Sequence, residues 1–335
     1  MLKRHRREVS VVIAIVALAI VLAVIAPGYF ARANLRDLFL ANLPVLIVAL
    51  GATLVILTGE IDISVGSVFA VCGVAAGLAA KAGLPVPAAG LAACAVGAAL
   101  GVMNGLLVAK VRVPSIVVTL ATMVALRDAL RWSTEGTWVQ DLPAGFQWLG
   151  LTQALYPVAM SVVAIVLVGT MAWGMRYLAV GRAIYATGSN ADAARLAGFD
   201  TAFVKLCVFS AAGALTGLAA VLNAVRFNQI PANAGLGLEM EVIAAVVVGG
   251  ASIRGGQGNI VGTLLGVVLL SAIGPGLTFL GVSAYWERAI QGAIILGAVG
   301  LDALRGRKGQ GARGEGRTRG ETRGLTSRSS GPAPA

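Results

Sequence analysis

The sequence predicts an all-α protein, a polytopic transmembrane helical bundle whose backbone crosses the bilayer about ten times. Hydrophobic residues make up 58% of the 335 positions and charged residues only 12%, about half the charged share of soluble domains. Glycine is abundant, at 44 residues, as is usual where membrane helices pack closely. The expected spans are 9–26, 43–58, 64–81, 86–109, 114–132, 155–174, 203–225, 239–251, 259–281 and 287–304.

The first and eighth spans need separate arguments. Residues 9–26 are as apolar as the core of a signal peptide. The run is long, however, and no clear small-residue cleavage site accompanies it, so we expect a retained span. Residues 239–251 are too few to cross the bilayer alone. We expect the glycine-rich link 249–258 to complete that crossing as irregular backbone inside protein.

Positive charge is concentrated at the ends of the chain and in alternate connections. Residues 1–8 hold four cations against one carboxylate and residues 302–335 hold eight against three, so the ends supply +8 of the net +11. Because cytoplasmic connections are enriched in Lys and Arg, we expect both termini to be cytoplasmic, N-in and C-in. The expected inner connections are 59–63, 110–113, 175–202 and 252–258.

This orientation divides the chain into three parts. Residues 1–8 are a basic cytoplasmic N-terminus, and residues 9–304 form the transmembrane domain with its long cytoplasmic loop at 175–202. The basic tail at 305–335 has almost no apolar residues, which predicts a disordered cytoplasmic segment.

Residues that usually carry metal or acid–base chemistry are scarce. The only histidine is His5, and Cys72, Cys94 and Cys207 lie in apolar segments without a CxxC spacing. We therefore expect no catalytic residue, no metal site and no cofactor bound to this chain. Basic residues do not form a stripe with interleaved aromatics, so we expect no nucleic-acid partner.

Several glycines repeat at intervals of four residues. This spacing places them on one helix face, where the backbones of two helices approach closely. The contacts lie within one chain or between subunits, and the spacing does not distinguish the two. The sets are Gly97, Gly101 and Gly105, then Gly213 and Gly217, then Gly262 and Gly266.

The inner loop 175–202 carries the pattern of a short capped helix. Ser189 followed three residues later by Asp192 resembles a capping box with Asp in place of Glu. Gly198 is well placed to end the helix, which leaves about two turns over 190–197. So short a helix is marginal alone, and we expect it either to dock on a partner protein or to lie on the membrane surface. The candidate docking residues are Ser189, Asn190, Asp192, Ala194, Leu196 and Gly198.

Residues 58–67 place two carboxylates between two spans. Asp62 or Ser64 is suited to cap a helix that starts at about Val65. A proton or cation site is the sharper alternative, because carboxylates near hydrocarbon must be hydrated, paired or hydrogen-bonded. The candidate residues of this inner loop or gate are Glu60, Asp62, Ser64 and Gly66.

Residues 248–258 are glycine-rich but lack the Gly-Lys-Ser/Thr ending of a phosphate-binding loop. We interpret them as a tight inner turn. Charges toward the outer side are sparse, and they serve either as boundary anchors or as the lining of a polar translocation path. The candidate path residues are Arg127, Asp128, Glu239 and Glu241.

Together these segments resemble the membrane permease subunits of bacterial ABC importers for sugars, which include ribose, xylose, arabinose, rhamnose and autoinducer-2 systems. The resemblance runs from about residue 38 to residue 302. It rests on four motifs in order, at 59–66, 104–110, 181–198 and 237–250. Residues 136–143 and 185–188 look most like the autoinducer-2 and rhamnose permeases. Glu60, which precedes Ile61, departs from the common Gly-Ile-Asp pattern.

The resemblance implies a multi-pass protein of the bacterial inner membrane that works in a larger complex. A second permease copy or paralogue would form a path with it, and a periplasmic binding protein would deliver the solute. Two cytoplasmic subunits would bind ATP and Mg²⁺ and receive the helix at 190–197 as a coupling helix. This chain would contact membrane lipids and would not itself be an enzyme.

Three other functions remain as alternatives. A permease for branched-chain amino acids or nucleosides would share a similar architecture. An ion-coupled secondary transporter would need an ionisable site at the midplane, whereas Glu60 and Asp62 lie near the inner boundary in the expected topology. An intramembrane enzyme would need a zinc motif or a nucleophile–base pair, and the sequence offers neither.

Overall fold

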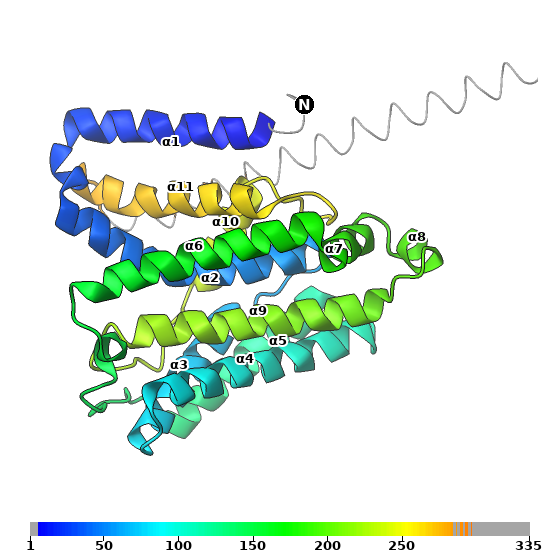
Figure 1. The fold of residues 1–335 in the computed structure, drawn as a ribbon, viewed down its shortest axis with the longest axis horizontal. Helices are drawn as coiled ribbons and strands as arrows, with labels where there is room; N and C mark the ends of the chain where they lie inside the picture. Colours follow the sequence, from blue (N-terminus) through cyan, green and yellow to red (C-terminus); the bar gives the residue numbers. More distant parts are fainter. Residues whose placement is uncertain (1–5, 284–285, 287–288, 291, 294–295, 297–335) are drawn as a thin grey trace, which may run out of the picture.

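The computed structural model describes residues 6–283 together with 286, 289–290, 292–293 and 296, and this part is helical (Figure 1). Among these residues, pairing of the strand type is limited to one bridge between Val139 and Ile230. The expected tenth span at 287–304, apart from isolated positions, and the expected tail at 305–335 lie outside the described residues. Residues 1–5 of the basic N-terminus lie outside them as well.

The described helices match the first nine expected spans. The second begins earlier than expected because polar residues continue the helix, and Asn34 and Asn42 donate to the backbone oxygens of Tyr29 and Leu38. The helices are α1 Arg6–Ile25, η1 Pro27–Phe30, α2 Arg32–Leu57, α3 Val65–Lys81, α4 Val86–Ala109, α5 Ser115–Thr134, η2 Gln147–Gly150, α6 Leu155–Tyr177, α7 Ala179–Ser189, α8 Ala191–Leu196, α9 Thr201–Ala224, α10 Leu238–Val248 and α11 Ile260–Phe279.

Six of these helices, α1, α2, α4, α6, α9 and α11, are long and apolar enough to cross a membrane. The α-helical class and the membrane character of the sequence prediction are thereby confirmed. Helices α3 and α10 are shorter, with 17 and 11 residues, and α5 carries three charges at Arg127, Asp128 and Arg131. The core surrounds α2, whose residues Ile47, Leu50 and Leu57 are fully buried.

The connections gather at two ends of the bundle. At one end, which we call the α8 end, Gly256 donates its N–H to the Leu57 oxygen at 2.9 Å, and Tyr185 donates its hydroxyl to the Gly258 oxygen at 2.8 Å. The first turn of α1 joins the same end, since Asn259 donates to Glu8 (Figure 1).

At the opposite end, which we call the Trp148 end, Trp148 donates its N–H to the Val225 oxygen at 2.7 Å. Lys81 donates to the Gln140 oxygen at 2.9 Å, so the connection after α3 meets the long segment 133–154. The connections expected on the inner side therefore share one end, and those expected on the outer side share the other.

Helices α4 and α9 make the closest helix contact of the bundle through glycines. A Cβ atom on Gly97 would overlap the backbone oxygen of Gly213, and one on Gly101 would overlap the oxygen of Phe209. The same holds for Gly217 against the oxygen of Ala93. The glycine spacing therefore marks a contact within the chain, which the sequence left open.

The eighth crossing differs from the expectation that residues 249–258 complete it. Those residues form a turn at the α8 end, where Gly255 and Gly256 pack on the last residue of α2 and the loop after it and on α7. The irregular backbone of this crossing instead precedes α10, over residues 226–237, which we call the re-entrant segment. Irregular backbone is stable at membrane depth only where protein or water surrounds it.

Helix α3 supplies the protein that surrounds the re-entrant segment. Ile230 contacts α3 at Gly73 and Gly77. Gly235 packs against Gly66 and Phe69, which lie nearer the start of the same helix. The segment therefore descends along α3 from the Trp148 end, and α10 begins beside the first turn of α3.

We predict that Gly97→Ala lowers the stability of the protein, because the new Cβ forces two backbones apart. Overpacking of this kind costs about 1–3 kcal/mol, which a thermal unfolding curve in detergent measures. Gly169→Ala in α6 is the matched control, since a Cβ there meets open space. Equal unfolding temperatures for the two variants would contradict the role of the α4–α9 contact.

Candidate functional site

The short helix expected in the inner loop is present as α8, and Asn190 rather than Ser189 caps it. The Asn190 carboxamide oxygen accepts from the N–H groups of Asp192 at 3.1 Å and Ala193 at 3.0 Å. Ser189 fails as the cap because it is still the last residue of α7, whereas Asn190 has the extended backbone that a cap requires. Asp192 does not close a capping box but pairs with Arg195 at 3.2 Å.

Gly198 ends α8 as predicted. Its backbone is left-handed, with φ of +87°, and its N–H donates to the Arg195 oxygen at 2.9 Å. The next N–H, of Phe199, reaches back to the Ala194 oxygen at 3.0 Å. These two bonds form a Schellman motif, for which glycine is the preferred residue.

The two apolar candidates on α8 face opposite ways. Leu196 is 92% exposed, whereas Ala194 is 4% exposed and packs against its own chain. Only Leu196 of this pair is therefore positioned to contact a partner directly. Ala194 is better understood as a residue that seats α8 on the loop.

Helix α7 precedes α8 and was not expected from the sequence. Its buried residues Gly181, Ile184 and Thr187 recur every three positions, and this periodicity was the signal that could have revealed it. At its last turn Gly188 lies so close to the Leu57 oxygen that a Cβ would not fit. The base of the loop is thus packed directly on the end of α2, beside Glu60.

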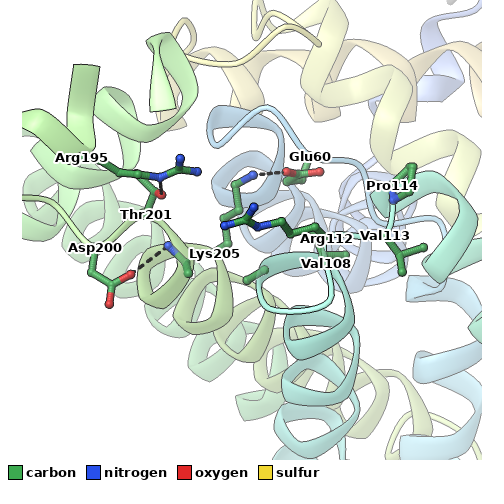
Figure 2. Close-up of a pocket in the computed structure, with 11 residues that line it drawn as sticks. Glu60, Val108, Arg112, Val113, Pro114, Arg195, Asp200, Thr201 and Lys205 are labelled. Atoms are coloured by element: carbon green, nitrogen blue, oxygen red, sulfur yellow. Dashed lines mark hydrogen bonds and ion pairs between the residues drawn. The ribbon is translucent and has the colours of Figure 1, made fainter. Parts of the chain in front are cut away.

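A cavity of about 390 Å³ lies at the α8 end, between the loop after α2, the α4–α5 connection and the α8–α9 connection. Figure 2 shows charged side chains from all three segments around it. Lys205 forms an ion pair with Glu60, and both are largely shielded from solvent. The cavity is lined by Glu60, Val108, Ala109, Arg112, Val113, Pro114, Arg195, Asp200, Thr201, Ala202 and Lys205.

The other charges of this cavity connect α8 with α9. Arg195 donates its Nε–H to the hydroxyl of Thr201 at 3.0 Å. Asp200 caps α9 by accepting from the N–H groups of Ala202 and Phe203, both at 3.0 Å. Contacts thus run from α8 to the first turn of α9, and from Lys205 of α9 to Glu60.

A chain of buried hydrogen bonds leads from α5 to the loop before α3. The Thr122 hydroxyl donates to the Asn104 carboxamide oxygen at 2.7 Å, and Asn104 donates to the Ser64 hydroxyl oxygen at 3.0 Å. Ser64 then donates its hydroxyl at 2.6 Å and its N–H at 2.8 Å to one oxygen of Asp62. All four residues are buried.

Helix α3 starts at Val65 as expected, but neither proposed cap acts in the usual way. Ser64 occupies the capping position without a side-chain bond to the helix, and Asp62 instead holds Ser64. Sequence reasoning did not identify Asn104 or Thr122 as members of this network. Their signal was a carboxamide and a hydroxyl inside apolar spans, where polar side chains need partners.

The candidate path residues fall into two groups. Arg127 is buried and donates to the Ala234 oxygen at 2.9 Å, and the charge of Glu239 acts on it. Asp128 instead points away and forms an exposed pair with Arg131 at 3.7 Å. Glu241 lies one half-turn further along α10. The structure thus places Arg127 within electrostatic reach of Glu239, without an ion pair between them, and turns Asp128 toward Arg131.

The part of the chain that the structure describes contains no group of three or more His, Cys, Asp or Glu side chains placed to hold a metal ion.

A bundle of apolar helices with a short capped helix at one end and buried polar contacts inside is typical of a multi-pass membrane protein. The chain belongs to the family described as "Branched-chain amino acid transport system / permease component", whose model matches residues 34–299. The sequence resemblance to ABC importer permeases is thereby confirmed, and the chain is a multi-pass permease of the bacterial inner membrane.

Curated relatives cover most of the chain. It is 38% identical over 299 residues to the autoinducer 2 import system permease protein LsrC of Salmonella typhi, across 89% of this chain and 86% of that protein. It is also 38% identical to the proteins of the same name from Yersinia pseudotuberculosis, over 300 residues, and from an Enterobacter species, over 298 residues. These alignments cover 89% and 88% of this chain and 85% and 86% of the two relatives. No solved structure matches this chain.

We predict that Asp62→Leu destabilises the protein far more than Asp62→Asn does. The leucine leaves the N–H and hydroxyl of Ser64 without their buried acceptor, at about 1–3 kcal/mol for each group, whereas asparagine keeps an oxygen at that place. Thermal unfolding in detergent compares the two variants. Equal losses would show that the carboxylate charge, not the acceptor, matters at this position.

Proposed function

We propose that this permease carries a sugar-like, polyhydroxylated solute, with autoinducer 2 as the first candidate. The observation that supports this proposal is the 38% identity to three autoinducer 2 permeases over nearly nine-tenths of the chain. The similarity of residues 136–143 and 185–188 to autoinducer-2 and rhamnose permeases agrees with it. Branched-chain amino acids, which the family description names, are the competing substrate class.

The α8 end is cytoplasmic in this proposal, and both termini lie on that side. All four connections expected to be inner line the cavity or contact α7 at this end, and three of them carry Arg112, Arg195 and Arg254. The fourth carries Glu60, which is neutralised by Lys205. Cytoplasmic retention of Lys and Arg favours this orientation. The ten crossings are then the expected span 287–304 and nine helices, namely α1, α2, α3, α4, α5, α6, α9, α10 and α11.

Helix α8 is the coupling helix of this permease, held by ATP-binding subunits that supply ATP and Mg²⁺. Its support is an apolar residue, Leu196, exposed on a capped and terminated helix outside the bundle. On the opposite face of α8, Ala194 is buried against the rest of the chain, and Arg195 binds Thr201 of α9. Arg112 on the cavity rim has no hydrogen bond or ion pair among the described residues, so it is free to contact the same subunit.

The remaining parts of the machine are a second permease, identical or paralogous, and a periplasmic binding protein that delivers the solute at the Trp148 end. The solute passes Arg127, Asp128, Glu239 and Glu241 on its way. The loop that holds Glu60, Asp62, Ser64 and Gly66 closes the inner end, because it joins the cavity beside α8 to the buried hydrogen-bond chain.

We predict that single cysteines report opposite sides of the membrane. In a variant whose Cys72, Cys94 and Cys207 are replaced by alanine, Trp138→Cys should react with a membrane-impermeant maleimide in spheroplasts. Leu196→Cys should react only in inverted vesicles, because both positions are exposed but lie at opposite ends. Labelling of Leu196→Cys from outside would reverse the proposed orientation.

We predict that the reconstituted importer accumulates autoinducer 2 and that Leu196→Asp uncouples it. Proteoliposomes would hold both permeases and the ATPase, with binding protein outside and ATP inside. A charge in the apolar contact of α8 should lower uptake about tenfold or more, as a loss of about 1.4 kcal/mol would, while membrane insertion and basal ATP hydrolysis persist. Leu196→Met, which keeps the apolar contact, should retain uptake.

The control for this experiment is Leu84→Asp, an exposed residue at the Trp148 end, which should transport normally. Full uptake by Leu196→Asp would contradict docking at α8. Uptake that continues without ATP but collapses with an ion gradient would replace the ABC mechanism by ion coupling. Preferred uptake of leucine over autoinducer 2 would move the substrate to the amino-acid class.

A further inference from the structure

Two crossings of this bundle are broken, and they are broken from opposite ends. Helix α3 is preceded by the non-helical residues 58–64, which leave the α8 end, and α10 is preceded by the re-entrant segment 226–237, which leaves the Trp148 end. The first turns of the two short helices meet, because Gly66 of α3 contacts the side chain of Glu239 on α10. Broken helices of this kind place their starts inside the bilayer rather than at its surface.

The meeting point lies near mid-depth. Glu239 precedes Gly249, at the α8 end, by ten residues of helix, or about 15 Å at 1.5 Å per residue. Arg127 follows Ser115, which starts α5 at the same end, by twelve residues, or about 18 Å. The hydrocarbon layer is about 30 Å thick. With the α8 ends of these two helices taken as one face of that layer, both charges lie close to its centre.

Glu239 has hydrogen-bonding capacity that the protein does not use. Its Oε2 atom is buried and accepts no hydrogen bond from the described residues. Arg127, on which the charge of Glu239 acts, is held in place by the Ala234 oxygen of the re-entrant segment. A buried carboxylate oxygen without a donor is costly, and ionisable groups at mid-depth usually face a polar path.

The chemistry of this pair favours one kind of ligand. A carboxylate only accepts hydrogen bonds, and those donated by a hydroxyl to an ionised group are short and strong. The fixed guanidinium leaves little net charge at the site, so a neutral solute rich in hydroxyls suits it. A solute that carries its own carboxylate, such as an amino acid, would meet repulsion from Glu239.

We propose that Glu239, positioned by Arg127 and by the glycine at 66, is a mid-membrane recognition point that accepts hydrogen bonds from the hydroxyls of a neutral solute in transit. This inference rests on the proposed function and adds to it a place and a residue for solute selection. Asp128 is no part of this point, because its side chain is exposed and pairs with Arg131.

A structural role would leave a different signature. An acidic residue in the first turn of a helix stabilises the helix through its dipole, and Glu239 occupies that turn of α10. Removal of such a charge changes stability but does not change which solute is preferred. The discriminating measurement is therefore the loss of preference between a solute and its analogue that lacks one hydroxyl.

We predict graded losses of uptake in the reconstituted importer for Glu239→Gln and Glu239→Met. The probes are tritiated autoinducer 2 and its analogue with one hydroxyl replaced by hydrogen. Glu239→Met should lower uptake of the parent solute about tenfold, the factor expected for a hydrogen bond to a charged group. It should also take up the parent and the deoxy analogue equally, whereas the wild type prefers the parent. Glu239→Gln, which keeps one acceptor oxygen, should lie between.

The control is Met240→Leu, whose exposed side chain neighbours Glu239 on α10, with uptake as in the wild type. Stimulation of ATP hydrolysis by the loaded binding protein should persist within twofold in every variant. If Glu239→Met does not assemble, a threefold or larger loss of uptake in Glu239→Gln, together with a weaker preference for the parent solute, supports the proposal.

Unchanged uptake in either assembled Glu239 variant would overturn the recognition point. Parallel loss of uptake and of stimulated ATP hydrolysis, with the preference between the two solutes kept, would also overturn it and assign Glu239 to the fold. If wild-type proteoliposomes take up neither solute in the presence of ATP, the proposed function as an importer of a sugar-like solute is contradicted, and the recognition point with it.

Discussion

Helices α4 and α9 approach so closely that no side chain fits between Gly97 and Gly213 or between Gly101 and Phe209. In a bilayer, helix association relies on such backbone contact, since lipid tails are as apolar as any side chain. This contact sets the position of both helix ends. The end of α4 leads to Arg112 and the start of α9 brings Asp200 and Lys205, so the cavity at the α8 end follows from it.

Polar groups inside such a bundle must find partners in the protein, and this requirement organises the loop before α3. Ser64 is held by Asp62 and by Asn104, and Asn104 is in turn held by Thr122. Asp62 and Ser64 belong to the loop itself, whereas Asn104 and Thr122 come from α4 and α5. The loop is thereby tied to both α4 and α5.

The coupling site and the recognition point that we propose occupy different depths of the bundle. Leu196 faces solvent at one end, and Glu239 lies near the middle with its carboxylate against Gly66. The elements between them are continuous, because α8 is joined to α9 by Arg195 and α9 is joined to the loop of Glu60 by Lys205. A two-state movement of that loop would let both positions respond to the same event, as coupling between distant sites requires.

The sequence by itself determined the elements that depend on local chemistry and composition. Apolar runs predicted the long helices of the bundle, and glycines at intervals of four predicted close packing. Gly198 predicted the end of α8, where its backbone is left-handed. Prediction erred by one residue at the cap of α8, because α7 extends through Ser189 and leaves Asn190 as the first extended residue. It also placed the irregular part of the eighth crossing after α10 rather than before it.

Only the tertiary structure decided which of these elements meet. Asn104 and Thr122 read as isolated polar residues until α4 and α5 bring them beside Ser64. Glu239 and Gly66 are separated by most of the chain and come together because the two broken helices start at the same depth from opposite ends. Such contacts depend on how helices pack in three dimensions, and no local pattern in a single sequence records the partner of a packed face.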